Sequence, residues 1–163
     1  MVRILFVCNT YCSQAARWIS QLSGSGYDIH LFDPYHSPLY PGLHGVTVHT
    51  GWQKEYVPAG VIVRCRYPFV RGRYFLQKRL PRLWQLIVPP STVMLAQLIK
   101  RLQPNCIHVL YGMQKGCYVL FDSRKYLGGD LPAPWIYSSR GSDLYYYGQF
   151  NIELGKFSKN AIT

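Results

Sequence analysis

The chain has 163 residues, of which 48% are apolar and 15% charged; this composition favours one folded domain and excludes a disordered chain. Eighteen lysines and arginines outnumber seven acidic residues, and the formal charge of +11 favours an anionic partner such as a phosphorylated substrate, nucleic acid or a lipid surface. Five cysteines without C-x-x-C spacing indicate a reduced, cytoplasmic protein rather than a disulfide scaffold or a zinc module.

The first third of the chain alternates apolar runs with helix and turn signals. Residues 2–8 are an almost unbroken run of β-forming side chains, which predicts a strand buried on both faces of a parallel sheet. Ser13 is the expected cap of a helix that Gly24 helps to end. Strands are predicted again at 27–32 and 46–49, which makes a βαβ unit.

The last part of the chain continues this alternation. Ser91 is the expected cap of an amphipathic helix that Pro104 ends. Residues 106–111 predict a strand, 114–127 a helix and 135–137 a further strand. The whole pattern predicts an α/β domain with an open parallel sheet.

No apolar stretch has the length of a membrane span. Only five apolar residues follow Arg3, too few for a signal-peptide core, and Pro89 and Pro90 interrupt the best candidate for a spanning helix. Any membrane contact is therefore expected to be peripheral, at the inner face of the cell membrane.

The segment ILFVCNTYCSQAARW, residues 4–18, allows three interpretations. A phosphatase loop needs five residues between its cysteine and its arginine, but the required position holds Gln14 after Cys8 and Trp18 after Cys12. A redox pair is disfavoured because the first cysteine would lie on the strand and the second in the loop. Cys8 is therefore expected in the core, and the third interpretation is the first strand, loop and helix of a nucleotide-sugar enzyme.

A second polar corner follows the last predicted strand. In PAPWIYSSRGSDLYYYG, residues 132–148, the strand breaks at Ser138 and a new helix begins near Ser142 or Asp143. Gly141 allows close approach of the backbone, and the first amides of the helix favour a hydroxyl or phosphate oxygen. The alternative is an ordinary capped helix without a ligand.

Four segments share their order and spacing with a known family: VRILFVCNTYCSQAARW, YDIHLFDP, LIKRLQPNCIHVLYGMQKG and WIYSSRGSDLY. In this order they resemble the N-terminal, acceptor-side domain of GT-B-fold glycosyltransferases of the large retaining family four, over most of residues 2–150. The resemblance implies a single Rossmann-like domain with helices on both faces of its sheet. It also implies a second domain that binds most of the nucleotide-sugar donor, and no further cofactor.

The resemblance implies a binding site at the carboxyl ends of the strands, where ligands of open α/β sheets lie. The first loop would contact acceptor and donor phosphate, and by position Ser139 or Arg140 would lie beside the transferred sugar. Two departures are the missing glycine pair of the first loop and the charge of Arg140, where many relatives have a neutral residue. No catalytic residue is assigned. The expected substrate-binding residues are Asn9, Thr10, Tyr11, Gln114, Ser139, Arg140, Gly141 and Asp143.

The donor half of such an enzyme has no counterpart here. Retaining members have a pair of glutamates in the donor domain, whereas this chain has only Glu55 and Glu153, far apart. Residues 1–163 are therefore expected to be an N-terminal domain truncated at its C-terminus. It should be nearly inactive alone, because half a cleft cannot position both donor and acceptor. The expected activity of the whole enzyme is hexosyl transfer from a nucleotide sugar to a cell-surface glycan or lipid-linked acceptor.

The middle of the chain, residues 51–90, interleaves aromatic and basic side chains. Aromatic groups in the headgroup layer and cations on anionic lipid would anchor the protein to a membrane. A surface helix that packs its aromatic side on the sheet is the alternative. A non-enzymatic module that binds membrane or single-stranded nucleic acid is another, although no helix-turn-helix or RRM signature is present. The expected membrane contacts are Arg71, Arg73, Tyr74, Phe75, Lys78, Arg79 and Trp84.

Metal and dinucleotide binding are disfavoured. The five histidines lack H-x-x-x-H or mixed Cys/His spacing, and His108, inside a strand, is expected to be a hydrogen-bonded core residue. Asp33 follows a strand, as does the ribose-binding acid of dinucleotide folds, but the first loop has no G-x-G-x-x-G.

Overall fold

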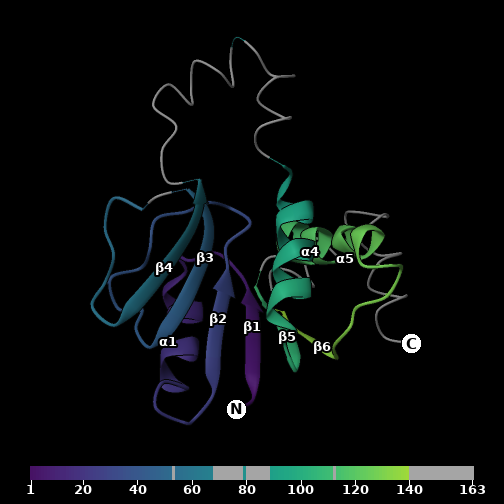
Figure 1. Cartoon of the computed structure of the whole chain (residues 1–163). Coiled ribbons are helices and arrows are strands. Elements are labelled where there is room, and N and C mark those ends of the chain that lie inside the picture. Colours follow the sequence, from purple (N-terminus) through teal and green to yellow (C-terminus); the bar gives the residue numbers. More distant parts are fainter. Residues whose placement is uncertain (53, 68–78, 80–88, 112, 140–163) are drawn as a thin grey trace.

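One parallel sheet organises the part of the chain that this computed structural model describes, residues 1–52, 54–67, 79, 89–111 and 113–139 (Figure 1). The strands of this part are β1 (Arg3–Val7), β2 (Asp28–Phe32), β3 (Val46–Trp52), β4 (Val61–Tyr67), β5 (Cys106–Leu110) and β6 (Trp135–Ser138). The helical elements of the same part are α1 (Ser13–Gln21), α4 (Ser91–Leu102), the π-helix η1 (Met113–Cys117), α5 (Tyr118–Ser123) and the 3₁₀ turn η2 (Arg124–Tyr126).

The strand order is β4-β3-β2-β1-β5-β6, and each neighbouring pair runs parallel. From β1 the chain builds the sheet outward in one direction through β2, β3 and β4, then crosses to the other side of β1 to place β5. The loops after β1 and β5 therefore diverge at a topological switch point, as in Rossmann-like folds. The prediction of an open, Rossmann-like parallel sheet is confirmed.

Helix α1 covers one face of the sheet. Ala15, Ala16 and Ile19 recur at helical spacing and pack against inward-facing side chains such as Phe6 and Val48. The helix begins at Ser13, but the capping prediction is wrong: Cys12 holds the N-cap position, and no side chain caps the helix.

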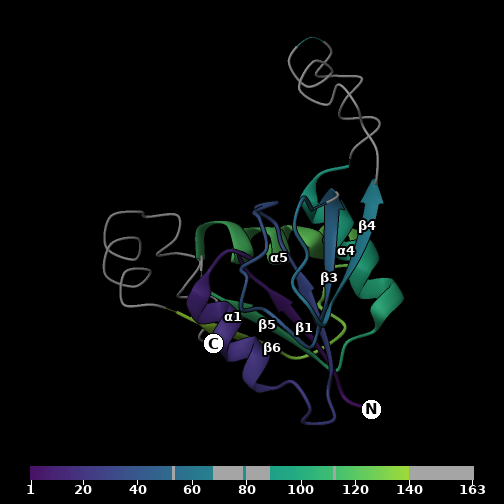
Figure 2. The same ribbon diagram turned by 90° about the vertical axis from the view of Figure 1, so that its left-hand side faces the viewer.

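Helices α4 and α5 cover the opposite face, as Figure 2 shows. Leu95 and Ile99 of α4 are fully buried against Leu5 of β1. Successive side chains of a strand point to opposite faces, so Leu5 lies on the face opposite to the one that α1 covers. The expected cap is wrong here too, since Ser91 is the first residue of the helix and Pro90 its N-cap. The helix ends as predicted before Pro104, at Gln103 in the left-handed conformation. Helices thus lie on both faces of the sheet.

The outer edge beyond β2 is built differently. The link from β3 to β4 is short, and its described residues, 54–60, contain no helix. Gly45 donates its amide to the carbonyl of Gly60 at 3.0 Å, which aligns the starts of the two strands. On the α4 side of this pair, Ile62 keeps 60% of its surface exposed. The described part of the chain therefore covers the face of the sheet over β3 and β4 only partly.

The predicted helix 114–127 is a composite of η1, α5 and η2. A Cβ on Gly116 would lie 3.0 Å from Cγ1 of Val109, so the π-helix sits closer to β5 than a residue with a side chain would easily allow. The predicted stop is confirmed: Gly128 and Gly129 have positive φ, and Gly129 donates its amide to the carbonyl of Arg124. None of the helices in the described ranges has both the length and the apolar character to cross a bilayer.

Candidate functional site

The predicted substrate-binding residues that the structure describes lie at one edge of the sheet, where the parallel strands end. Asn9, Thr10 and Tyr11 follow β1, Gln114 lies in η1 after β5, and Ser139 follows β6. The side chain of Gln114 and the whole of Arg140, Gly141 and Asp143 lie outside the described residues. We call the residues that directly follow β1, β2, β3, β5 and β6 the rim.

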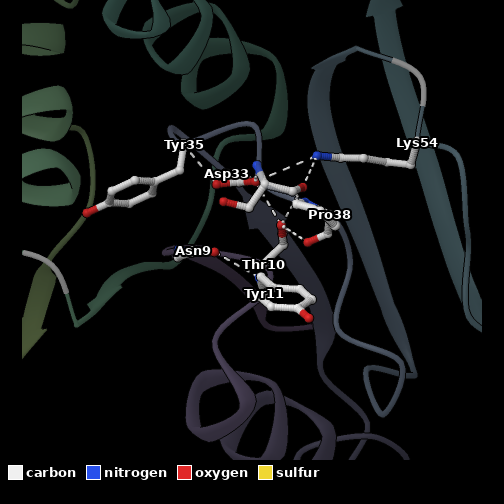
Figure 3. A network of polar contacts seen from close by, with 8 residues as sticks. Asn9, Thr10, Tyr11, Asp33, Tyr35, Pro38 and Lys54 are labelled. Carbon is white, nitrogen blue, oxygen red and sulfur yellow. Dashed lines mark hydrogen bonds and ion pairs between the residues drawn. The ribbon is translucent and has the colours of Figure 1, made fainter.

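The rim is organised around a buried carboxylate (Figure 3). Asp33, fully buried, accepts the Thr10 hydroxyl at 2.7 Å and the backbone amides of Tyr35 at 2.9 Å and Ser37 at 2.6 Å. The bond from Thr10 connects the loop after β1 with the loop after β2, and the two amide bonds fix the loop after β2 around Asp33. The amide of Tyr40 adds a further link between the two loops by donating to the carbonyl of Thr10.

Lys54 supplies the countercharge. Its Nζ lies 3.6 Å from Asp33 Oδ2 and donates to the carbonyl of Ser37, and only 6% of its side chain is exposed. Burial lowers the pKa of Lys54 below its usual value, and the neighbouring carboxylate of Asp33 opposes this shift. Figure 3 shows the lysine reaching the carboxylate from the β3 side. A buried ion pair therefore ties the end of β3 to the end of β2.

The two neighbours Thr10 and Tyr11 have opposite environments. Thr10 is 2% exposed, and its one hydroxyl proton has acceptors in Asp33, Ser37 and Pro38 within 3.1 Å. Tyr11 is 59% exposed, and its amide donates to the side-chain oxygen of Asn9 in a local turn. Of the three predicted residues of this loop, Tyr11 is thus the one whose side chain faces solvent, while Thr10 holds the loop in place.

A cation and an aromatic ring meet across the switch point. The Nζ of Lys115, in η1, lies 5.0 Å from the ring centroid of Tyr35, in the loop after β2. Lys115 is exposed, so its charge also faces solvent at the rim. Tyr111, the first residue after β5, has a φ of +49°, a strained conformation for an aromatic residue. Such strain gathers at ligand sites more often than elsewhere in a fold.

Asp33 cannot serve as a ribose-binding acid in this arrangement. A dinucleotide fold presents that carboxylate to the ligand, whereas both oxygens of Asp33 are buried and accept bonds from within the chain. The position after β2 is therefore used to hold the rim together.

The expected core position of Cys8 is confirmed, whereas His108 is hydrogen-bonded as expected but only half-buried. Cys8 is fully buried, and burial, reinforced by the charge of Asp33, raises the pKa of its thiol well above the usual range. A thiolate nucleophile at this position is therefore strongly disfavoured. His108 is half-buried in β5, and its Nε2 lies 2.8 Å from the hydroxyl oxygen of Ser138.

Most of the expected membrane contacts fall on residues that the structure does not describe. Arg79 is exposed. The other six, Arg71, Arg73, Tyr74, Phe75, Lys78 and Trp84, lie outside the described residues.

Sequence reasoning missed three rim residues: Tyr35, Lys54 and Lys115. Lys115 could have been found, because it follows Gln114 directly. Tyr35 follows Asp33 and Pro34, which in the sequence indicate only that the strand predicted at 27–32 ends there. Lys54 gave no signal, since it lies where the sequence pattern left the structure open.

The chain matches no protein-family model and shows no significant similarity to a curated protein. Within the described ranges, no three His, Cys, Asp or Glu side chains come together as a metal site.

Proposed function

We propose that this chain is the acceptor-side domain of a GT-B-type glycosyltransferase and that its rim holds the anionic part of a lipid-linked or glycan acceptor. One observation supports this most: the loops after β1 and β5 separate at the switch point, where ligands of open α/β sheets bind, and there exposed Lys115 lies beside Tyr35. The segments that carry the family resemblance include β1, β5 and the loops after them. The proposal therefore assigns the ligand to these loops.

The charge balance of the rim supports an anionic ligand. Asp33 is buried and neutralised by Lys54, so it does not repel an anion at the surface. Lys115 keeps a solvent-facing ammonium, and Tyr11 offers an exposed ring and hydroxyl on the other side of the switch point. A diphosphate bound between them would gain charge-assisted hydrogen bonds, and a sugar could stack on the ring.

The test is a titration of the full chain with a short-chain prenyl diphosphate sugar, in which binding is monitored by the chemical shifts of the backbone amides. Saturable shifts confined to residues 9–11 and 111–117 are expected. Lys115→Gln should weaken binding about tenfold, the usual effect of losing one charge-assisted hydrogen bond. Lys125→Gln, which removes an equally exposed charge from η2, is the matched control and should leave the affinity unchanged.

Two results would contradict the proposal. If the Lys115→Gln and Lys125→Gln variants bind with equal affinity, the rim is not the binding site. The transfer reaction itself is tested by the coding sequence after codon 163, which should continue into a second α/β half with paired glutamates. If the reading frame ends there, a basic α/β binding module remains in place of an enzyme.

A further inference from the structure

A cavity of about 350 Å³ lies between α4 and the outer strands β3 and β4. It opens on the partly covered face of the sheet, where the β3–β4 link supplies no helix in its described residues. His49, Arg64 and Arg101 contribute the basic part of its lining, and Met94 and Leu98 of α4 the apolar part. Ligand pockets begin at about 300 Å³, so this volume suits a small molecule rather than a polymer.

The charge of this cavity is strongly one-sided. Arg64 comes from β4 and Arg101 from the last turn of α4, and none of the lining residues that the structure describes is acidic. Among the residues that the structure describes, neither arginine forms an ion pair. Two guanidinium groups from separate elements therefore share one concave surface without a carboxylate between them.

His49 lines the same cavity as a neutral group. It is 6% exposed, and its pKa falls to about 3 because of its burial and, secondarily, because of the nearby His30, Arg101 and Arg64. At neutral pH the described lining of the cavity thus carries two positive charges, one from each arginine. A neutral imidazole can donate or accept a hydrogen bond there without adding to the repulsion.

A row of side chains across the sheet fixes the His49 ring. Nε of Arg3 donates to Asp28 at 2.8 Å, the other Asp28 oxygen lies 3.0 Å from Nε2 of His30, and Nδ1 of His30 lies 2.9 Å from Nε2 of His49. The row runs from β1 through β2 to β3. It orients the imidazole from behind, so the wall of the cavity is held in one arrangement.

We propose that this cavity is a binding site for a small phosphate monoester. A phosphate group has three acceptor oxygens and a charge of about −1.5 to −2 at neutral pH, which matches two guanidinium groups, whereas a carboxylate supplies only half of that charge. The rest of the ligand would lie against Met94 and Leu98. None of the lining residues belongs to the rim, and the site does not rest on the function proposed for the rim.

Isothermal titration of the full chain with inorganic phosphate and with methyl phosphate tests this assignment. Saturable binding is expected with a dissociation constant of about 1 mM or lower, and acetate should bind at least about tenfold more weakly because it carries one charge. Arg64→Gln and Arg101→Gln should each weaken phosphate binding about tenfold. Both side chains are exposed, so neither change should unfold the protein.

Controls separate a site from general attraction to a basic protein. Lys100→Gln removes an exposed charge from the same helix, next to Arg101 but outside the cavity lining, and should leave the affinity unchanged. Amide shifts should move in β3, β4 and α4. An equal loss in the Lys100→Gln variant, shifts at residues 9–11 and 111–117 instead, or no saturable phosphate binding would each overturn the proposal. Since the Lys115→Gln variant probes the rim alone, failure at one site does not imply failure at the other.

Discussion

Asp33 and Lys54 form the most consequential pair of side chains at the rim. Each is almost completely removed from water, and desolvation of two charges costs about as much as their attraction returns. The pair is therefore better understood as a positional constraint than as a source of stability. It holds the loop after β2, and through Thr10 the loop after β1, in one arrangement.

Replacing Asp33 with Asn tests this role. The change leaves the Lys54 ammonium buried without its countercharge, so the free energy of unfolding should fall by about 3 kcal/mol, the usual effect of breaking a buried pair. Urea denaturation measures it. Asp122→Asn, which breaks the exposed pair with Lys125, is the control and should change the free energy by about 0.5 kcal/mol or less.

A double variant distinguishes an unpaired charge from simple loss of hydrogen bonds. Asp33→Asn with Lys54→Met removes both charges, and should recover a large part of the stability lost in the single variant. If the double variant is as unstable as the sum of the two single variants, the charge pair does not account for the effect.

His49 predicts an acid-dependent loss of stability. In the unfolded chain its pKa is near 6.5, and in the folded protein about 3, so between these values the unfolded state binds the additional proton. The free energy of unfolding should therefore fall as the pH is lowered from 6.5 towards about 4, by up to about 1.4 kcal/mol per pH unit. His49→Gln should reduce this slope, whereas exposed His44→Gln should retain it; equal slopes in both variants would contradict the prediction.

At the scale of elements, the sequence predicted strands best where the residue pattern was compatible with only one kind of secondary structure. β1, β2 and β5 are largely buried, and their mainly apolar sequences located each of their ends to within one residue. β4 was missed because its sequence, VIVRCRY, was grouped with the basic segment. Its alternation of Val61 and Val63 with Ile62 and Arg64 in fact reflects one face packed towards α1 and one partly open face.

The candidate site was predictable in place but not in detail. Parallel strands bring their carboxyl ends to one edge, so Tyr11, Gln114 and Ser139 could be assigned to the rim from strand order alone. The inward turn of Thr10 and the partnership of Asp33 with Lys54 depend on how two distant loops pack. No local pattern encodes a contact between residues that lie 21 positions apart.

The composite helix after β5 makes a prediction about packing. Gly116→Ala places a methyl group 3.0 Å from Cγ1 of Val109, in a region with little room to relax, and should lower the free energy of unfolding by about 1–3 kcal/mol. Combining it with Val109→Ala removes the clashing methyl group. The double variant should then lose less stability than the two single changes added together, and strict additivity would locate the strain elsewhere.

The molecule as a whole carries a charge of +11, and its like charges repel one another most in the compact state. Raising sodium chloride shortens the screening length from about 30 Å at 0.01 M to about 8 Å at 0.15 M. The melting temperature at pH 7 should therefore rise by about 2–4 °C, the equivalent of roughly 1 kcal/mol. A chloride series is required, since phosphate buffer would occupy the proposed cavity. A melting temperature that falls with salt would show that attractive pairs outweigh the repulsion.

The helix-free passage between β3 and β4 has a consequence for how the sheet opens. Among the described residues, β4 pairs with β3 alone and has little apolar cover towards α4, while β1 lies between two strands under helices on both faces. Amide deuteration should therefore proceed as a gradient, fastest in β4 and slowest in β1 and β5, because outer ladders detach at lower free energy than the centre. β4 would then open while the central strands stay in place, and a ligand that bridges β4 to α4 should slow deuteration of β4 most.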